Sequence, residues 1–281
     1  MTKARASVAQ ANVTGVSPWS ESAASSDAGV PGATLYRRGA VRRLIAVETQ
    51  RRVPRPWVTA DGSLEAIKWV ALILMVLDHV NKYLYAEKLP VIFQCGRIVM
   101  PMFGFVLAYN LARPDALARG VHGRMMYRLT LAGLAAFPMF FILNGMYVTA
   151  NAWWPLNILF MLLLVVSLTY LLDRGGAKCY ALAATLFLFG GAFVEYLWMG
   201  VLSCLGAWLF CRDACTGRLL LWFLGTLSLT VVNGNAWALA AIPMVLLAGR
   251  ISVRLPRLTW VFYAFYPAHL LLLLGVRWEW F

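Results

Sequence analysis

The stretch LILMVLDHVNKYLY, residues 72–85, decides the fold because it places an acid and an imidazole inside an apolar segment. Leu72 to Leu77 are all apolar, and Asp78 and His79 follow them directly. An ionisable side chain at membrane depth costs several kcal/mol, so chains seldom keep one without a use. The stretch therefore predicts a membrane helix that carries functional groups.

The composition of the whole chain agrees with this interpretation. Hydrophobic residues make up 61% of the 281 residues and charged residues 13%, whereas a soluble domain has about 45–50% apolar and about 25% charged residues. The apolar runs are long and show no strand-like alternation, which favours helices. Twelve Trp and eleven Tyr suit a protein with two membrane–water interfaces. We therefore expect an all-α, polytopic integral membrane bundle.

The charge and the cysteines argue against two other classes of protein. The net charge is +13, but no nucleic-acid motif accompanies it, so we expect no nucleic-acid partner. Cys211 and Cys215 form a single CxxxC without a second ligand pair nearby. A structural zinc site needs four ligands, so we expect no metal, and no disulfide framework is legible.

Composition divides the chain into two parts. Residues 1–60 are Ser/Ala/Gly-rich and then Arg-rich, which predicts a disordered, basic cytoplasmic extension that contacts anionic membrane lipid. No secretory apolar region precedes residue 66, so we expect no cleaved signal peptide. Residues 61–281 form the predicted transmembrane domain. Its apolar runs predict about nine helices, within a range of eight to ten: 65–85, 97–112, 125–143, 153–172, 179–194, 196–211, 218–232, 236–249 and 258–276.

The distribution of Lys and Arg orients these helices. With a cytoplasmic N-terminus, the inner loops carry eleven Lys and Arg and the outer side carries four. Cytoplasmic loops are enriched in these residues, so the N-terminus is predicted to be cytoplasmic. The bacterial appearance of the sequence places the protein in the inner, or cytoplasmic, membrane as a multi-pass protein.

The first helix places a lysine and a histidine on one face. His79 follows Lys68 by eleven positions, and eleven steps of about 100° return close to the starting direction. The two residues are then separated by roughly 16 Å of helix rise. Asp78 points away from this face, toward Lys82 one turn later, and an interfacial Asp–Lys pair is its simpler explanation.

Arg97, Asn157, Glu195 and Tyr196 fall near the predicted outer ends of other helices. Each also has a structural explanation: an interfacial anchor, an interhelical hydrogen bond or a solvated loop acid. His269 lies within the last predicted helix, where Tyr263, Tyr266 and His269 stand at i, i+3 and i+6 and share one stripe. We expect one cavity to collect the candidates, and such an inventory suits acid–base catalysis or a proton-coupled transporter. These candidates are Asp78, His79, Arg97, Asn157, Glu195, Tyr196, Tyr266 and His269.

Several segments together resemble the TraX family, over about residues 61–281. They are LEAIKWVALILMVLDHVNKYL, CGRIVMPMFGFVLAYNL, NILF, EYLWMG and YAFYPAHLLLL. The resemblance implies a role in conjugation, and the type member of the family acetylates the N-terminus of F pilin. The spacing of Lys68 and His79 is also similar to a basic-x10-His pattern in membrane acyltransferases. The resemblance thus implies an acetyltransferase with acetyl-CoA as donor and a pilin subunit, or another acceptor, as partner.

Under this hypothesis His79 is the general base or a transient acetyl carrier. Asp78 orients His79 or stabilises its cation, and Arg97 stabilises the oxyanion or a phosphate. His269 is a second acid–base group or gates acceptor entry, and Lys68 meets the CoA pantetheine or pyrophosphate. The remaining substrate-binding candidates are Asn157, Glu195, Tyr196 and Tyr266. Two alternatives stay open: a proton-coupled transporter and a non-catalytic membrane protein of pilus or secretion assembly.

Overall fold

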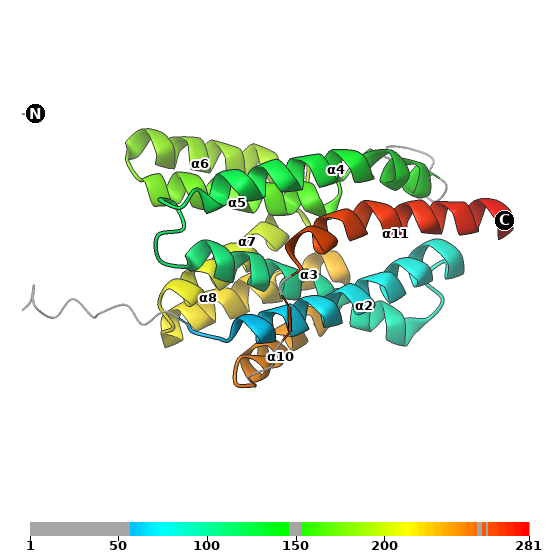
Figure 1. The fold of residues 1–281 in the computed structure, drawn as a ribbon, viewed down its shortest axis with the longest axis horizontal. Coiled ribbons are helices and arrows are strands. Elements are labelled where there is room, and N and C mark those ends of the chain that lie inside the picture. Colours follow the sequence, from blue (N-terminus) through cyan, green and yellow to red (C-terminus); the bar gives the residue numbers. More distant parts are fainter. Residues whose placement is uncertain (1–56, 146–152, 252–254, 257, 281) are drawn as a thin grey trace, which may run out of the picture. The chain divides into compact units, whose positions relative to one another are not determined.

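A computed structural model describes residues 57–145, 153–251, 255–256 and 258–280 of the chain (Figure 1). Within these residues the regular elements are all helices, which confirms the predicted all-helical class. The predicted extension over residues 1–60 lies almost wholly outside the described residues. The helices are α2 (Asp61–Tyr85), α3 (Pro90–Ala112), α4 (Val121–Gly145), α5 (Ile158–Arg174), α6 (Ala177–Gly190), α7 (Leu197–Arg212), α8 (Thr216–Leu227), α9 (Thr230–Asn233), the 3-10 helix η1 (Trp237–Ala240), α10 (Ala241–Ala248) and α11 (Thr259–Trp280).

Each predicted helix corresponds to an observed one, but some boundaries differ. The second helix begins at Pro90 rather than residue 97, because proline is well suited to the first turn of a helix. The fourth begins at Ile158 rather than residue 153, because Asn157 caps it. The predicted helices 218–232 and 236–249 are each divided, into α8 and α9 and into η1 and α10.

Three of the described helices are long and apolar enough to cross a membrane: α3, α4 and residues 260–279 of α11. The other predicted spans differ from these for physical reasons. Helix α2 has 25 residues but carries five charged side chains, and α5, α6 and α7 have 17, 14 and 16 residues. A perpendicular span needs about 20 residues. The predicted helices are therefore found at the expected positions, but among the described residues only three have the length and composition of a membrane span.

Helix α3 lies at the centre of the packing. It contacts α2, α7, η1 and α10, and most of its residues from Ile98 to Leu111 are buried. Helix α5 contacts α3 and also packs against α4 and α6, and α11 contacts both α4 and α2 (Figure 1). A Cβ atom at Gly206 would lie 2.7 Å from the Trp222 Cα, so glycine there allows α7 and α8 to pack closely.

Two ion pairs show that α2 and α3 run antiparallel. Arg113, just after α3, pairs with Asp61 at the start of α2, and Arg97 pairs with Asp78 in the second half of α2. Helix α11 runs parallel to α2, because Phe262 near its start packs against Trp69 and Arg277 near its end donates to the backbone oxygen of Tyr83. The charged residues of these helices therefore gather at two opposite ends.

Candidate active site

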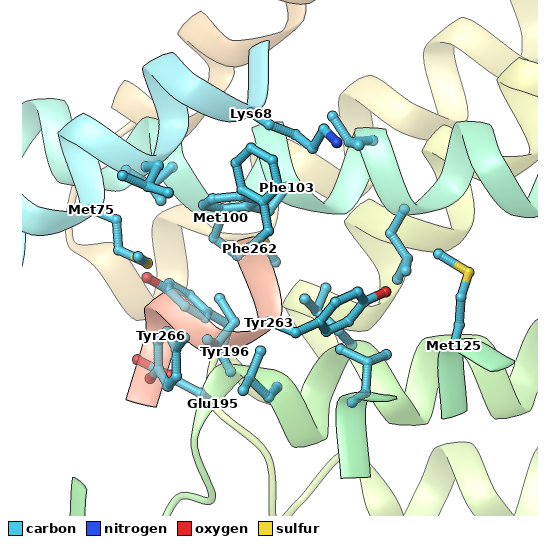
Figure 2. A pocket seen from close by; sticks show the side chains of 18 of the residues that line it. Lys68, Met75, Met100, Phe103, Met125, Glu195, Tyr196, Phe262, Tyr263 and Tyr266 are labelled. Carbon is cyan, nitrogen blue, oxygen red and sulfur yellow. The ribbon is translucent and has the colours of Figure 1, made fainter. Parts of the chain in front are cut away.

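A cavity of about 670 Å³ lies among α2, α3, α4, α5, α11 and the turn before α7 (Figure 2). We call one end the basic end, which is lined by Lys68, Arg113, Arg119, Arg124 and Arg128. We call the other the histidine end, which is lined by Asp78, His79, Lys82, Arg97, Glu195, Tyr196 and Tyr266. One cavity thus collects most of the residues that the sequence singles out.

The two candidate histidines are in direct contact at the histidine end. His79 Nδ1 lies 2.6 Å from His269 Nε2, a hydrogen-bond distance, and the ring planes differ by 2°. His79 comes from α2 and lines the cavity, whereas His269 comes from α11 and lies behind it with 6% of its surface exposed. The sequence identifies both histidines as candidate site residues on separate helices, and the structure shows that the two side chains are in contact.

The surroundings of His269 assign the protons in this pair when both rings are neutral. His269 Nδ1 lies 3.1 Å from the backbone oxygen of Phe265, which can only accept a hydrogen bond. Nδ1 must therefore carry the proton of His269, and Nε2 is left as an acceptor. His79 must then donate from Nδ1, so its own Nε2 carries a free lone pair. This is the protonation pattern of a base held by a second group.

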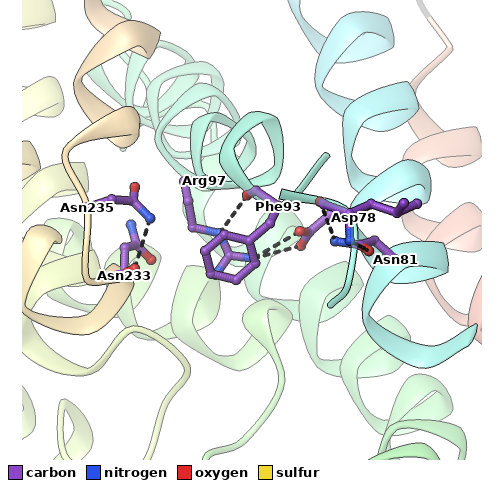
Figure 3. Close-up of polar contacts among 7 residues, drawn as sticks. Asp78, Asn81, Phe93, Arg97, Asn233 and Asn235 are labelled. Carbon is purple, nitrogen blue, oxygen red and sulfur yellow. Dashed lines mark hydrogen bonds and ion pairs between the residues drawn. The ribbon is translucent and has the colours of Figure 1, made fainter. Parts of the chain in front are cut away.

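Asp78 and Arg97 form an ion pair next to the histidines (Figure 3). Arg97 Nη2 donates to both carboxylate oxygens at 2.9 and 3.1 Å, and Nε donates to the Phe93 backbone oxygen at 3.3 Å. The Phe93 ring lies under the guanidinium, 4.3 Å from its carbon. The structure shows no hydrogen bond between Asp78 and His79. Asp78 instead holds Arg97, and His269 is the residue that orients His79, the role expected of Asp78.

Glu195 and Tyr196 lie in a strained turn between α6 and α7. Tyr196 and Leu197 have φ angles of 63° and 51°, which are uncommon for residues other than glycine. Two backbone hydrogen bonds hold the turn, from Leu156 N to Phe193 O and from Glu195 N to Leu156 O. Both predicted side chains line the cavity, next to Tyr266 (Figure 2). Backbone strain of this kind is frequent at functional sites.

Lys68 lies toward the opposite end of the cavity. Its Nζ is 2.5 Å from Glu65 Oε1 and 4.4 Å from the centre of the Phe262 ring. Glu65 lies three positions before Lys68 on α2 and does not line the cavity. Lys68 is therefore a positioned cation, since a carboxylate and an aromatic face both hold it.

Asn157 does not line the cavity, although the sequence suggests a substrate contact. Its Oδ1 accepts from Leu159 N at 3.1 Å and its Nδ2 donates to Gly133 O at 3.2 Å. The side chain is fully buried. Asn157 thus caps α5 and joins it to α4, which is the interhelical hydrogen bond that was the simpler explanation.

Two features of the cavity were missed at the level of sequence. Asn233 lines it, is 6% exposed, and has no partner for either side-chain polar atom among the described residues. It lies across Arg97 from Asp78 in Figure 3. The arginines of the basic end were counted only as charges that orient the helices. No local pattern marks Asn233, because an Asn beside Gly also suits an exposed turn.

Comparison with known proteins adds independent information. A sequence model of the TraX protein family matches residues 63–277. Two relatives named Protein TraX, from Escherichia coli strain K12 and from Escherichia coli, are 33% and 30% identical to the chain over 134 residues. These alignments cover 47% of this chain and 50% of each relative, so the chain spans about half the length of the relatives that it matches. No solved structure matches the chain. Because the family match extends from α2 into α11, which is most of the sequence, the chain belongs to the TraX family.

Proposed function

We propose that this chain is a multi-pass acetyltransferase of the bacterial inner membrane that acts in conjugation or pilus assembly. It transfers the acetyl group of cytoplasmic acetyl-CoA to the N-terminal amine of a pilin subunit. The observation that carries the proposal is the hydrogen-bonded pair of His79 and His269 beside a cavity. Membership of the TraX family supports the acceptor class, because the family resemblance implies pilin acetylation.

The surface of the helices supports a membrane location. Large apolar side chains are exposed along four helices, where water would disfavour them and lipid would not. They are Leu131, Leu134 and Phe141 on α4, Leu182, Leu188 and Phe189 on α6, Leu220 and Leu221 on α8, and Leu271 and Leu272 on α11. Together with the three helices of spanning length and composition, these faces favour an integral membrane protein.

His79 is the general base in the proposed reaction. The neutral acceptor amine attacks the thioester carbonyl carbon, and the new C–N bond forms as that carbonyl becomes an oxyanion. His79 Nε2, which has the free lone pair, accepts the proton of the attacking nitrogen. The oxyanion then collapses, the C–S bond breaks, and the proton passes from His79 to the departing sulfur. His269 does not line the cavity, so we assign it as a positioning residue rather than a gate.

Arg97 is the group best placed to stabilise the oxyanion. Its Nε and Nη2 are held by Phe93 and Asp78, whereas Nη1 has no hydrogen-bond partner within the described part of the chain. A fixed cation with a free donor stabilises developing negative charge without reorganising. Glu195, Tyr196 and Tyr266 supply polar groups at the same end and suit the binding of the acceptor amine.

The test is acetyl transfer by the purified full-length chain in lipid nanodiscs, with labelled acetyl-CoA and a synthetic pilin N-terminal peptide. Mass spectrometry locates the label on the peptide. His79→Ala should abolish transfer while the protein still inserts, and His122→Gln should retain it. His122 is the remaining histidine of the three in the chain and does not line the cavity. Full activity of a folded His79→Ala variant would overturn the assignment of the base, and no transfer by the unaltered chain would overturn the acetyltransferase.

A further inference from the structure

We propose that the basic end of the cavity is a binding subsite for the phosphate groups of a nucleotide-bearing thioester donor. The inference rests on the proposed function. It assigns the phosphates of the donor to the basic end and its acyl group to the histidine end. In the sequence only Lys68 is a candidate for this contact. The structure adds Arg113, Arg119, Arg124 and Arg128 around the same end.

Charge is segregated along the cavity. Of its lining residues, the carboxylates Asp78, Glu87 and Glu195 all lie toward the histidine end, and none lies among the five cations of the basic end. A concave surface lined by one sign of charge concentrates oppositely charged ligands. The basic end therefore suits a polyanion, and the histidine end suits an uncharged acyl group and an amine.

The arginines of the basic end retain donors for a ligand. Within the described residues, Arg119, Arg124 and Arg128 form no ion pair with a carboxylate. Arg113 pairs with Asp61, but its Nε is buried without a hydrogen-bond partner. Guanidinium groups match the oxygen geometry of phosphates through paired N–H donors. Several phosphates on one ligand would satisfy several of these groups together.

Some of these groups are held in place before any ligand binds. The Arg128 guanidinium carbon lies 4.8 Å from the centre of the Trp260 ring and 5.9 Å from that of Tyr263. Arg124 Nη1 donates to the Arg119 backbone oxygen at 2.7 Å. Such contacts lower the entropy that is lost when a ligand orders the side chains. Arg128 and Lys68 are thus held before a ligand binds, whereas Arg119 and Arg124 are exposed and would be ordered by the ligand.

The rise along α2 and along α11 gives the distance from the basic end to the histidine pair. Along α2, Lys68 and His79 are separated by roughly 16 Å of rise. Along α11, Trp260 beneath Arg128 and His269 are separated by roughly 14 Å. The extended pantetheine arm of CoA bridges a gap of this order between its pyrophosphate and its thioester. A donor with its phosphates at the basic end would therefore present its acetyl group to His79.

The test measures binding apart from catalysis, with the full-length chain in nanodiscs of neutral lipid. The probes are CoA, 3′-dephospho-CoA and acetyl-pantetheine, which lacks the nucleotide. The double variant Arg124→Gln/Arg128→Gln should weaken CoA binding by about tenfold or more, weaken 3′-dephospho-CoA less, and leave acetyl-pantetheine unchanged. Arg174→Gln is the matched control, because Arg174 is the last residue of α5 and does not line the cavity.

Each other outcome overturns the subsite. Equal losses for all three probes would show a general loss of structure, and unchanged CoA binding would show that the arginines are only solvated charges. If the variant loses affinity for anionic-lipid vesicles but not for CoA, the cluster binds lipid headgroups instead. Failure of the proposed function has a different signature, namely arginine-dependent CoA binding without acetyl transfer to the peptide.

Discussion

His269 holds His79 by a hydrogen bond of 2.6 Å between Nε2 and Nδ1, although 190 positions separate the two residues in the sequence. The Phe265 backbone oxygen fixes the proton of His269, and His269 in turn fixes that of His79. The free nitrogen of His79 is thereby directed by a residue that does not line the cavity.

The first prediction concerns His269. His269→Ala should lower kcat for acetyl transfer by about 10²-fold, because His79 loses the group that sets its tautomer, and the KM values for both substrates should change little. His269→Gln retains an acceptor oxygen and should recover part of the rate. Steady-state kinetics on the peptide acceptor measure both variants. Equal kcat values for the Ala and Gln variants would contradict a positioning role.

The second prediction concerns Gly96. A Cβ atom at this position would overlap the Asp78 carboxylate, so Gly96→Ala should displace Asp78 and disturb its ion pair with Arg97. We expect the free energy of unfolding to fall by about 1–3 kcal/mol, together with a loss of activity. Gly123→Ala is the control, because a Cβ there meets nothing within 4 Å. Chemical denaturation in detergent measures the difference, and equal stabilities of the two variants would argue against the close approach.

The third prediction tests the ion pair itself. The side chains of Asp78 and Arg97 are 13% and 14% exposed, so each single substitution leaves a largely buried charge without its partner. Asp78→Asn and Arg97→Gln should each lower stability and activity, and the double variant should lose less than the sum. A double-mutant cycle should give a coupling of about 1–3 kcal/mol. Strict additivity would mean that the two groups act separately.

The fourth prediction uses the unpartnered amide of Asn233. A buried polar side chain without hydrogen bonds costs about 1–3 kcal/mol, so Asn233→Leu should raise the free energy of unfolding. Acetyl transfer should fall, because the amide faces the cavity that the substrates enter. Asn81 is the matched control, since its amide bonds both the N and the O of Leu89. Asn81→Leu should lower the free energy of unfolding. A similar decrease in Asn233→Leu would contradict the prediction, because it would mean that the Asn233 amide forms stabilising hydrogen bonds.

The sequence predicts the helices well because each helix coincides with a run of apolar residues. It predicts their ends less well, since a run does not show where a cap forms. Asn157 is such a case: as a polar residue in an apolar segment it resembles a site residue, yet it caps a helix. Pro90 is another, because apolar residues before Arg97 extend the helix outward and place Arg97 within it.

The candidate site is predictable residue by residue but not in its contacts. His79 and His269 can each be singled out as a polar residue in a lipid-like segment. Their contact depends on how α2 packs against α11, and no local pattern encodes that. Asn233 and Arg128 could not be singled out from the sequence, because an Asn in a turn and an Arg near the start of a helix are common. Only the packing shows that they line the cavity.

The contact between α2 and α11 also bears on biosynthesis. One imidazole of the pair leaves the ribosome early and the other only after almost every other described residue has been made. During translation His79 therefore lacks its hydrogen-bond partner until α11 has been made. Under the proposed function, a chain that stops before residue 269 should have no transferase activity, so no thioester would be consumed before folding is complete.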